Sequence, residues 1–255
     1  MSKRKKFVLT SVLLSLGFVA VQFIDNTNRF WSIVLLSIST LILFWWSLKD
    51  TLGKDMTILT LVLPFIFTIG VGLFWFLLPI NIYARIPIII VYAIGIYVLC
   101  LTMNIFTISV NKTIALLRAA RGVGFVVSLV TLFLVVDAIL SLKAELFITT
   151  PLIFVVSFFL FAQSYWSVVP EREYQSQIVK LAIIAALILS ELNVMIFFWP
   201  STVAVSSLFF TMIYYVLTGL GQAYLEGRLF SNVIKDYLVV GFLVFVAIFF
   251  TTHWG

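Results

Sequence analysis

The chain has 255 residues, of which 63% are hydrophobic and 10% are charged, and its mean hydropathy is +1.21. Soluble domains contain about 45–50% apolar and about 25% charged residues, so this composition excludes both an ordinary soluble domain and a disordered chain. The formal net charge of +6 does not indicate a nucleic-acid partner, because the basic residues stand in the short connections between apolar runs. The composition therefore predicts a protein embedded in a lipid bilayer.

Charged residues and prolines divide the chain into nine apolar runs, most of them near the ~20 residues that a helix needs to cross a membrane. We expect an all-α polytopic membrane protein, because open strands leave backbone groups unpaired in lipid and these runs do not alternate like barrel strands. The predicted helices cover residues 7–24, 30–48, 56–78, 86–110, 122–142, 146–169, 178–199, 201–220 and 237–252. They leave no room for a soluble domain, so residues 1–255 are predicted to form a single transmembrane domain.

The first run is preceded by four basic residues at positions 3–6, which is the order found in a secretory signal peptide. The run is longer than the apolar region of a signal peptide, however, and no A-x-A cleavage site follows it. We therefore expect an uncleaved signal-anchor helix. The expected location is the cell membrane, meaning a plasma membrane or a bacterial inner membrane.

The orientation follows from the distribution of Lys and Arg over the two sets of helix ends. With the N-terminus inside, thirteen of the sixteen fall at inner ends, and only Arg29, Arg85 and Lys143 fall at outer ends. Inner ends of membrane helices carry the excess of Lys and Arg, so the N-terminus is predicted inside and the C-terminus outside. All seven Trp residues lie near predicted helix ends, as in interfacial aromatic belts.

The organisation of the chain leaves two alternatives open. Residues 221–236 carry apolar side chains at helical spacing and form either an amphipathic helix at the inner surface or a continuation of the neighbouring helices. Trp46-Ser47 and Trp166-Ser167 stand 120 residues apart. The first four helices are therefore either repeated in the next four, as in some transporters, or similar only because Trp favours helix ends.

Two acids stand inside predicted helices, Asp137 in the fifth and Glu191 in the seventh. At 1.5 Å per residue, Glu191 lies ~12 Å and Asp137 ~7 Å below the outer ends of their helices. A charge at such a depth is costly, so each acid is protonated, paired or exposed to a cavity. Both could line one outward-facing cavity and relay protons or cations. Alternatively, Asp137 reaches the interface and bonds Lys143 or water, and Glu191 is a neutral acid that bonds a neighbouring helix.

Other polar and small residues add to these candidates. Asn193 lies close to the second acid and completes the candidate intramembrane site, although it could equally form an interhelical hydrogen bond. Ala182 and Ala186 have the small-xxx-small spacing of close helix contacts. A basic patch on the inner side is predicted to contact anionic lipid headgroups, or else to serve orientation alone. Its members are Lys112, Arg118 and Arg121.

The sequence does not indicate a metal, a cofactor or a hydrolase site. The single cysteine, Cys100, lies inside an apolar run, and the single histidine is His253, so a His/Cys metal site is not expected. The motifs H-E-x-x-H, G-x-S-x-G, G-x-x-x-x-G-K-[ST] and C-x-x-C are absent. We assign no catalytic residue and expect neither a cofactor nor a nucleic-acid partner.

Three functions remain open at this point. The first is a small-solute or ion transporter, indicated by nine helices with short connections and by acids in one half of the bilayer. The second is a non-catalytic scaffold or accessory subunit bound to a membrane protein partner, indicated by the lack of motifs and by 26 Phe residues. The third is a lipid-handling enzyme, for which the short outer connections offer few charged residues. The sequence places transport slightly ahead.

Overall fold

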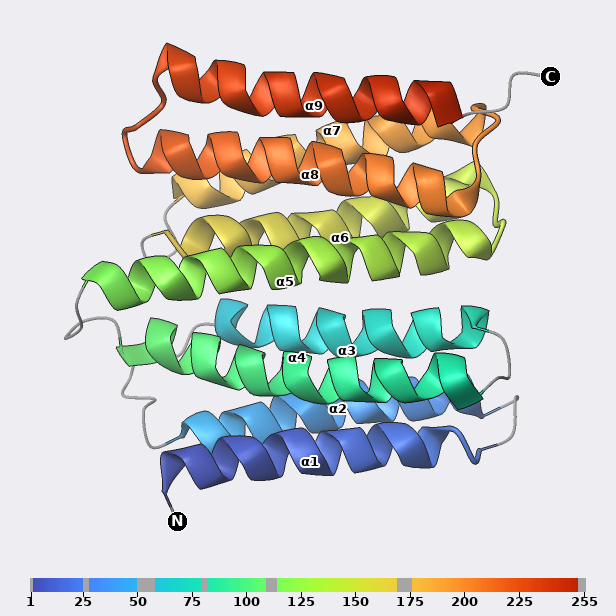
Figure 1. Cartoon of the computed structure of the whole chain (residues 1–255), viewed down its shortest axis with the longest axis vertical. Helices are drawn as coiled ribbons and strands as arrows, with labels where there is room; N and C mark the ends of the chain where they lie inside the picture. The colour runs from blue at the N-terminus through green and yellow to red at the C-terminus, as the bar shows by residue number, and fades with distance from the viewer. Residues whose placement is uncertain are drawn as a thin grey trace. The chain divides into compact units, whose positions relative to one another are not determined.

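The computed structural model describes residues 2–24, 28–49, 58–78, 82–108, 114–168 and 176–251, and every regular element in these ranges is an α-helix (Figure 1). The helices are α1 (Lys3–Val21), α2 (Arg29–Leu48), α3 (Leu59–Leu77), α4 (Ile82–Ile108), α5 (Ile114–Ser141), α6 (Leu146–Trp166), α7 (Ser176–Phe197), α8 (Val203–Leu225) and α9 (Ser231–Thr251). Eight of them, α2 to α9, are long and apolar enough to cross a membrane. The all-α polytopic membrane fold is thus confirmed.

The first helix is not among these eight, because it includes the four basic residues at positions 3–6. These residues leave residues 7–21 as its apolar part, which is shorter than the ~20 residues that usually cross a bilayer. The orientation of the chain and the role of α1 as a signal anchor stay predictions.

Helix ends differ from the predicted ones by five residues or more at two places. The fifth helix begins at Ile114 rather than at residue 122, so Arg118 and Arg121 lie inside α5. Arg residues can stand within a helix, because their long apolar stems let the charged group reach water while the backbone stays helical. The eighth helix ends at Leu225 rather than at residue 220, and the ninth begins at Ser231 rather than at residue 237. Residues 221–236 therefore belong largely to these two helices and form no separate one.

Packing divides the chain into two compact units, Met1–Thr131 and Leu132–Gly255, with the boundary inside α5. Each unit is described by itself below. Whether the two make one transmembrane domain stays a prediction.

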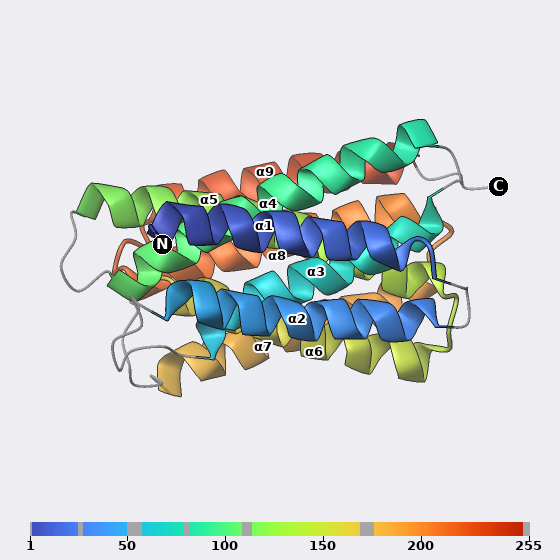
Figure 2. The ribbon, with the colours of Figure 1, turned by 90° about the horizontal axis from the view of Figure 1, so that it is seen from below.

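In the first unit, α1 packs against α2 and α4, and α3 packs against the same two helices. Figure 2 looks onto α1 and α2 of this group. Aromatic rings fill its centre: Phe18 contacts Trp75 edge-on with ring centroids 5.3 Å apart and contacts Tyr92 at 4.9 Å. The Phe67 ring stacks on Tyr92 with ring centroids 6.0 Å apart. All four rings are buried.

Hydroxyl groups satisfy one another inside this aromatic core. Thr68 shares hydrogen bonds with Thr40 of α2 at 3.1 Å and with Tyr92 of α4 at 3.3 Å. It also donates to the backbone oxygen of Pro64 at 3.0 Å. Three helices are thereby linked by neutral groups only.

In the second unit, α7 packs most extensively against α6. Ala182, Ala185 and Ala186 are buried on α7, and small side chains of this kind let membrane helices approach closely. The eighth helix packs on α6 and α7, and α9 packs chiefly on α8. No residue of the 231–250 part of α9 is buried.

Candidate functional site

The seventh helix has two chemically different faces, and they separate the predicted site residues. Its buried side carries Ala182, Ala186 and Asn193, whereas Glu191 lies on its exposed side. Residues two positions apart point about 200° away from each other on an α-helix. The structure therefore does not bring Glu191 and Asn193 to one surface.

Asn193 links α7 to α6. Its side-chain amide donates to the hydroxyl oxygens of Thr149 at 3.1 Å and Thr150 at 2.9 Å, and the residue is only 1% exposed. Among the described residues its Oδ1 has no hydrogen-bond partner. Two interhelical bonds to neighbouring threonines match the structural interpretation of Asn193 and hold α7 in one rotational setting.

Asp137 points into the protein. It lies near the end of α5, is 7% exposed and has its carboxyl group beside the hydroxyl of Ser207 of α8, which donates to Val203 O at 2.9 Å. Within the described residues it forms no ion pair with Lys143. A buried carboxyl group beside a hydroxyl of another helix has the polar surroundings that an acid needs inside a bilayer.

Glu191 has a different environment. It is exposed, and its neighbours along the same side of the helix are exposed and apolar, among them Leu187 at 45% and Met195 at 64%. In the part of the chain that the structure describes, its carboxyl has no hydrogen bond and no ion pair. It stands six residues before Phe197, the last residue of α7, and hence ~9 Å inside the helix end.

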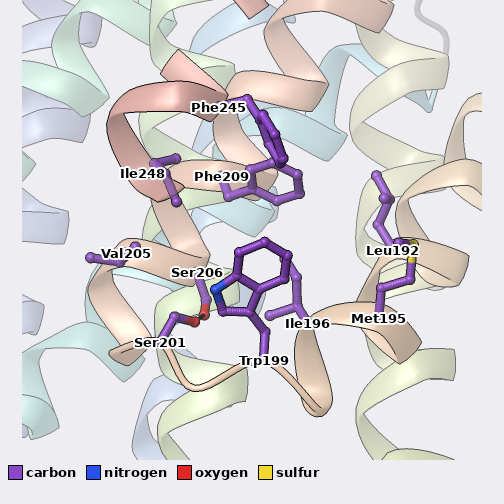
Figure 3. Close-up of a pocket in the computed structure, with 10 residues that line it drawn as sticks. All are labelled: Leu192, Met195, Ile196, Trp199, Ser201, Val205, Ser206, Phe209, Phe245 and Ile248. Atoms are coloured by element: carbon purple, nitrogen blue, oxygen red, sulfur yellow. Dashed lines mark hydrogen bonds between the residues drawn. The ribbon is translucent and has the colours of Figure 1, made fainter. Parts of the chain in front are cut away.

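An apolar cavity of the second unit lies near the turn between α7 and α8. Figure 3 shows Trp199 at its centre, facing Phe209 of α8 and Phe245 of α9. The cavity has a volume of about 130 Å³, and its lining presents carbon atoms almost throughout. Ser201 and Ser206 lie at one side, with their hydroxyl oxygens 2.6 Å apart in a mutual hydrogen bond. Glu191 does not line this cavity.

Sequence reasoning missed this cavity, since it favoured an interfacial belt for the tryptophans and named no aromatic partners for Trp199. The signal was weak, because the aromatic side chains that meet Trp199 come from two other helices. Its ring contacts Phe245 and Phe249 edge-on, with centroids 6.5 and 6.1 Å away. Contacts between residues this far apart in the chain have no local pattern in the sequence.

The predicted basic patch is described in part. Arg118 is exposed and Arg121 is half-buried, both in the first turns of α5, whereas Lys112 lies outside the described residues. The contact with anionic headgroups stays a prediction. No group of three His, Cys, Asp or Glu residues that could hold a metal ion occurs in the described ranges, and His253 lies outside them.

These features define a multi-pass, all-α membrane protein in which Asp137 and Glu191, both inside helices, have contrasting surroundings. The chain belongs to the family DUF5656, described as proteins of unknown function, whose profile matches residues 32–251. No curated protein and no solved structure matches it.

Proposed function

We propose that this protein is a non-catalytic subunit of a membrane protein complex and joins the complex through the exposed face of α7. The observation that carries the proposal is Glu191, an exposed carboxyl group without a described partner among exposed apolar side chains. The expected location is a plasma membrane or a bacterial inner membrane.

The cost of an isolated acid in lipid supports this proposal. A carboxylate at the centre of a bilayer costs ~3 kcal/mol or more, and intramembrane acids are almost always found in a protein interior or a wet cavity. Asp137, which is buried beside Ser207, follows this rule, and Glu191 does not. A second protein that covers the face would give Glu191 the same kind of environment.

The experiment is purification of the tagged full chain from its own membranes in a mild detergent. We expect a second membrane protein at a fixed molar ratio, measured by light scattering and quantitative mass spectrometry. Glu191→Gln should lower that ratio, because the amide keeps the shape but removes the charge. The matched control is Glu145→Gln, which removes an exposed carboxyl before α6 without touching α7. A lone monomer, with the same composition in all three preparations, would contradict the proposal.

Transport of a small solute or an ion is the second candidate, and Asp137 favours it. Ionisable residues inside membrane helices are rare, and those that occur mark ion and substrate pathways. A transport role predicts that Asp137→Asn abolishes uptake into vesicles while Glu145→Gln leaves it intact. If the Asp137→Asn and Glu145→Gln proteins take up a substrate equally well, transport through Asp137 is excluded and the non-catalytic subunit is the candidate that stands.

A further inference from the structure

The exposed face of α7 is a continuous strip of side chains one helical turn apart, which we call the Glu191 face. Its members are Ile184, Leu187, Ile188, Glu191, Val194 and Met195. The strip covers three turns, or ~16 Å along the helix. This length is enough for the contact between two crossing helices.

The helix cannot turn this face inward without losing its present contacts. Ala182 and Ala186 are fully buried on the other side, and Asn193 is bonded to two threonines of α6. A half-turn of α7 would break these bonds and would place bulky Ile184 and Leu187 where alanines now permit close packing. The Glu191 face is therefore a fixed outer surface of the second unit.

The charges of α7 give this surface a pattern. Lys180 and Glu191 are the only charged residues of the helix, and both are exposed. They stand eleven residues apart, which is close to three full turns, so they lie on the same side of α7. Lys180 is near the beginning of the helix, where its long side chain can reach water, whereas Glu191 lies too deep in the apolar part to do so.

We infer that the Glu191 face binds a transmembrane helix of another protein that presents a Lys or Arg side chain opposite Glu191. The inference rests on the proposed function and adds the chemistry of the partner. A cation at the same depth neutralises the carboxylate and is itself neutralised, which lowers the cost of both groups in lipid. A second copy of this chain would instead bring two carboxyl groups together, and lipid tails would leave Glu191 unpaired.

The test uses purified full-length protein in lipid vesicles and a synthetic transmembrane peptide as the probe. The protein carries Cys100→Ser and Met195→Cys, so its one thiol lies on the Glu191 face. The peptide is a leucine-rich helix of about 20 residues with one central Lys and one Cys a turn away. Matched peptides have Gln or Glu in place of the Lys.

We expect the disulfide between protein and peptide to form roughly fivefold faster, or more, with the Lys peptide than with the Gln peptide. Glu191→Gln should abolish this preference, and Glu191→Lys should transfer it to the Glu peptide. A thiol at Val239, which is 56% exposed against 64% for Met195 and belongs to α9 rather than α7, should show no preference.

Equal rates for the three peptides, or a preference for Lys that survives Glu191→Gln, would overturn the inference. So would crosslinking of the protein to itself in place of the peptide, because it would make a second copy the occupant. The peptide experiment needs no natural partner, so its failure differs from that of the proposed function. If the chain copurifies with a stoichiometric partner but the three peptides crosslink at equal rates, the proposed function stands and only the inferred chemistry of the partner is wrong.

Discussion

The two units differ in where they keep charge. The sequence of the first unit contains three acids, and all of them fall between helices: Asp25, Asp50 and Asp55. The second unit holds three acids inside its helices, of which Asp137 is buried whereas Glu191 and Asp236 are exposed. The described helices of the first unit contain basic residues but no acid, so carboxyl groups within helices are a feature of the second unit.

The two units resemble each other in their neutral hydrogen bonds. Tyr92 in α4 and Tyr214 in α8 stand 122 residues apart, are both 0% exposed, and each shares a hydrogen bond with a hydroxyl group of another helix. Ser47 and Ser167 stand 120 residues apart and each donates to the backbone oxygen three residues earlier. These pairs agree with the offset of the predicted repeat, which stays a prediction.

The largest expected effect comes from Gly221 in α8. A Cβ at this position would overlap the Tyr165 ring, which is 2% exposed and donates to Leu217 O at 3.1 Å. We expect Gly221→Ala to lower the free energy of unfolding by about 2 kcal/mol through overpacking. Gly122→Ala in the first unit is the control, since nothing lies within 4 Å of its Cβ and alanine favours the helix. Titration with SDS in mixed micelles measures both, and equal stability of the two variants would show that α8 can move away from Tyr165.

The second prediction compares the two buried tyrosines. The hydroxyl of Tyr214 shares a 2.7 Å bond with Ser164 and donates to Leu160 O at 3.2 Å, whereas that of Tyr92 bonds Thr68. At ~0.6 kcal/mol per bond in membranes, Tyr214→Phe should cost about 1.2 and Tyr92→Phe about 0.6 kcal/mol. The same titration measures the difference, and a larger loss for Tyr92→Phe would contradict this ranking.

The third prediction separates the two intramembrane acids by their effect on folding. Asp137→Ala should lower the free energy of unfolding by about 0.6 kcal/mol, because it removes the polar contact of the buried carboxyl with Ser207. Glu191→Ala should change it by less than about 0.5 kcal/mol, as is usual for exposed positions without internal partners. Thermal unfolding of the purified variants in detergent checks this. A strong destabilisation by Glu191→Ala would mean that the carboxyl serves the fold rather than a partner.

The smallest expected effect belongs to Ser47 and Ser167. Each hydroxyl donates to a backbone oxygen of its own helix, at 3.1 and 2.7 Å, a local bond that adds little to stability, so replacement by alanine should change the stability by less than about 0.5 kcal/mol. Parallel melting curves should show the same small shift for both variants. A large shift for one alone would weaken the correspondence between the units.

The sequence predicted the helices that are bounded by clear signals. Prediction and structure differ by three residues or fewer for α6 and α7, because charged residues and Pro200 stand at their ends. The start of α5 could not be predicted in this way, because Arg118 and Arg121 are basic residues within a helix. The sequence alone does not distinguish a side chain that extends from a helix to water from one that lies between helices.

The rotational setting of α7 was the part of the candidate site hardest to predict. The helix is apolar on all sides, so its hydrophobic pattern does not distinguish a buried face from an exposed one. One signal was available in the small pair Ala182 and Ala186. Extending its spacing along the helix reaches Asn193 and leaves Glu191 on the opposite side. The partner of Asp137 had no such signal, because Ser207 is 70 residues away in the chain.

The cavity around Trp199 also has a consequence for the order of biosynthesis. Trp199 and Phe209 emerge from the ribosome before Phe245 and Phe249 of α9, so the cavity is completed only when α9 docks onto α8. Until then, one side of the Trp199 indole meets lipid or the insertion machinery instead of two phenylalanine rings. In a variant that keeps Trp199 as its single tryptophan, fluorescence would report the moment at which α9 arrives and the second unit closes.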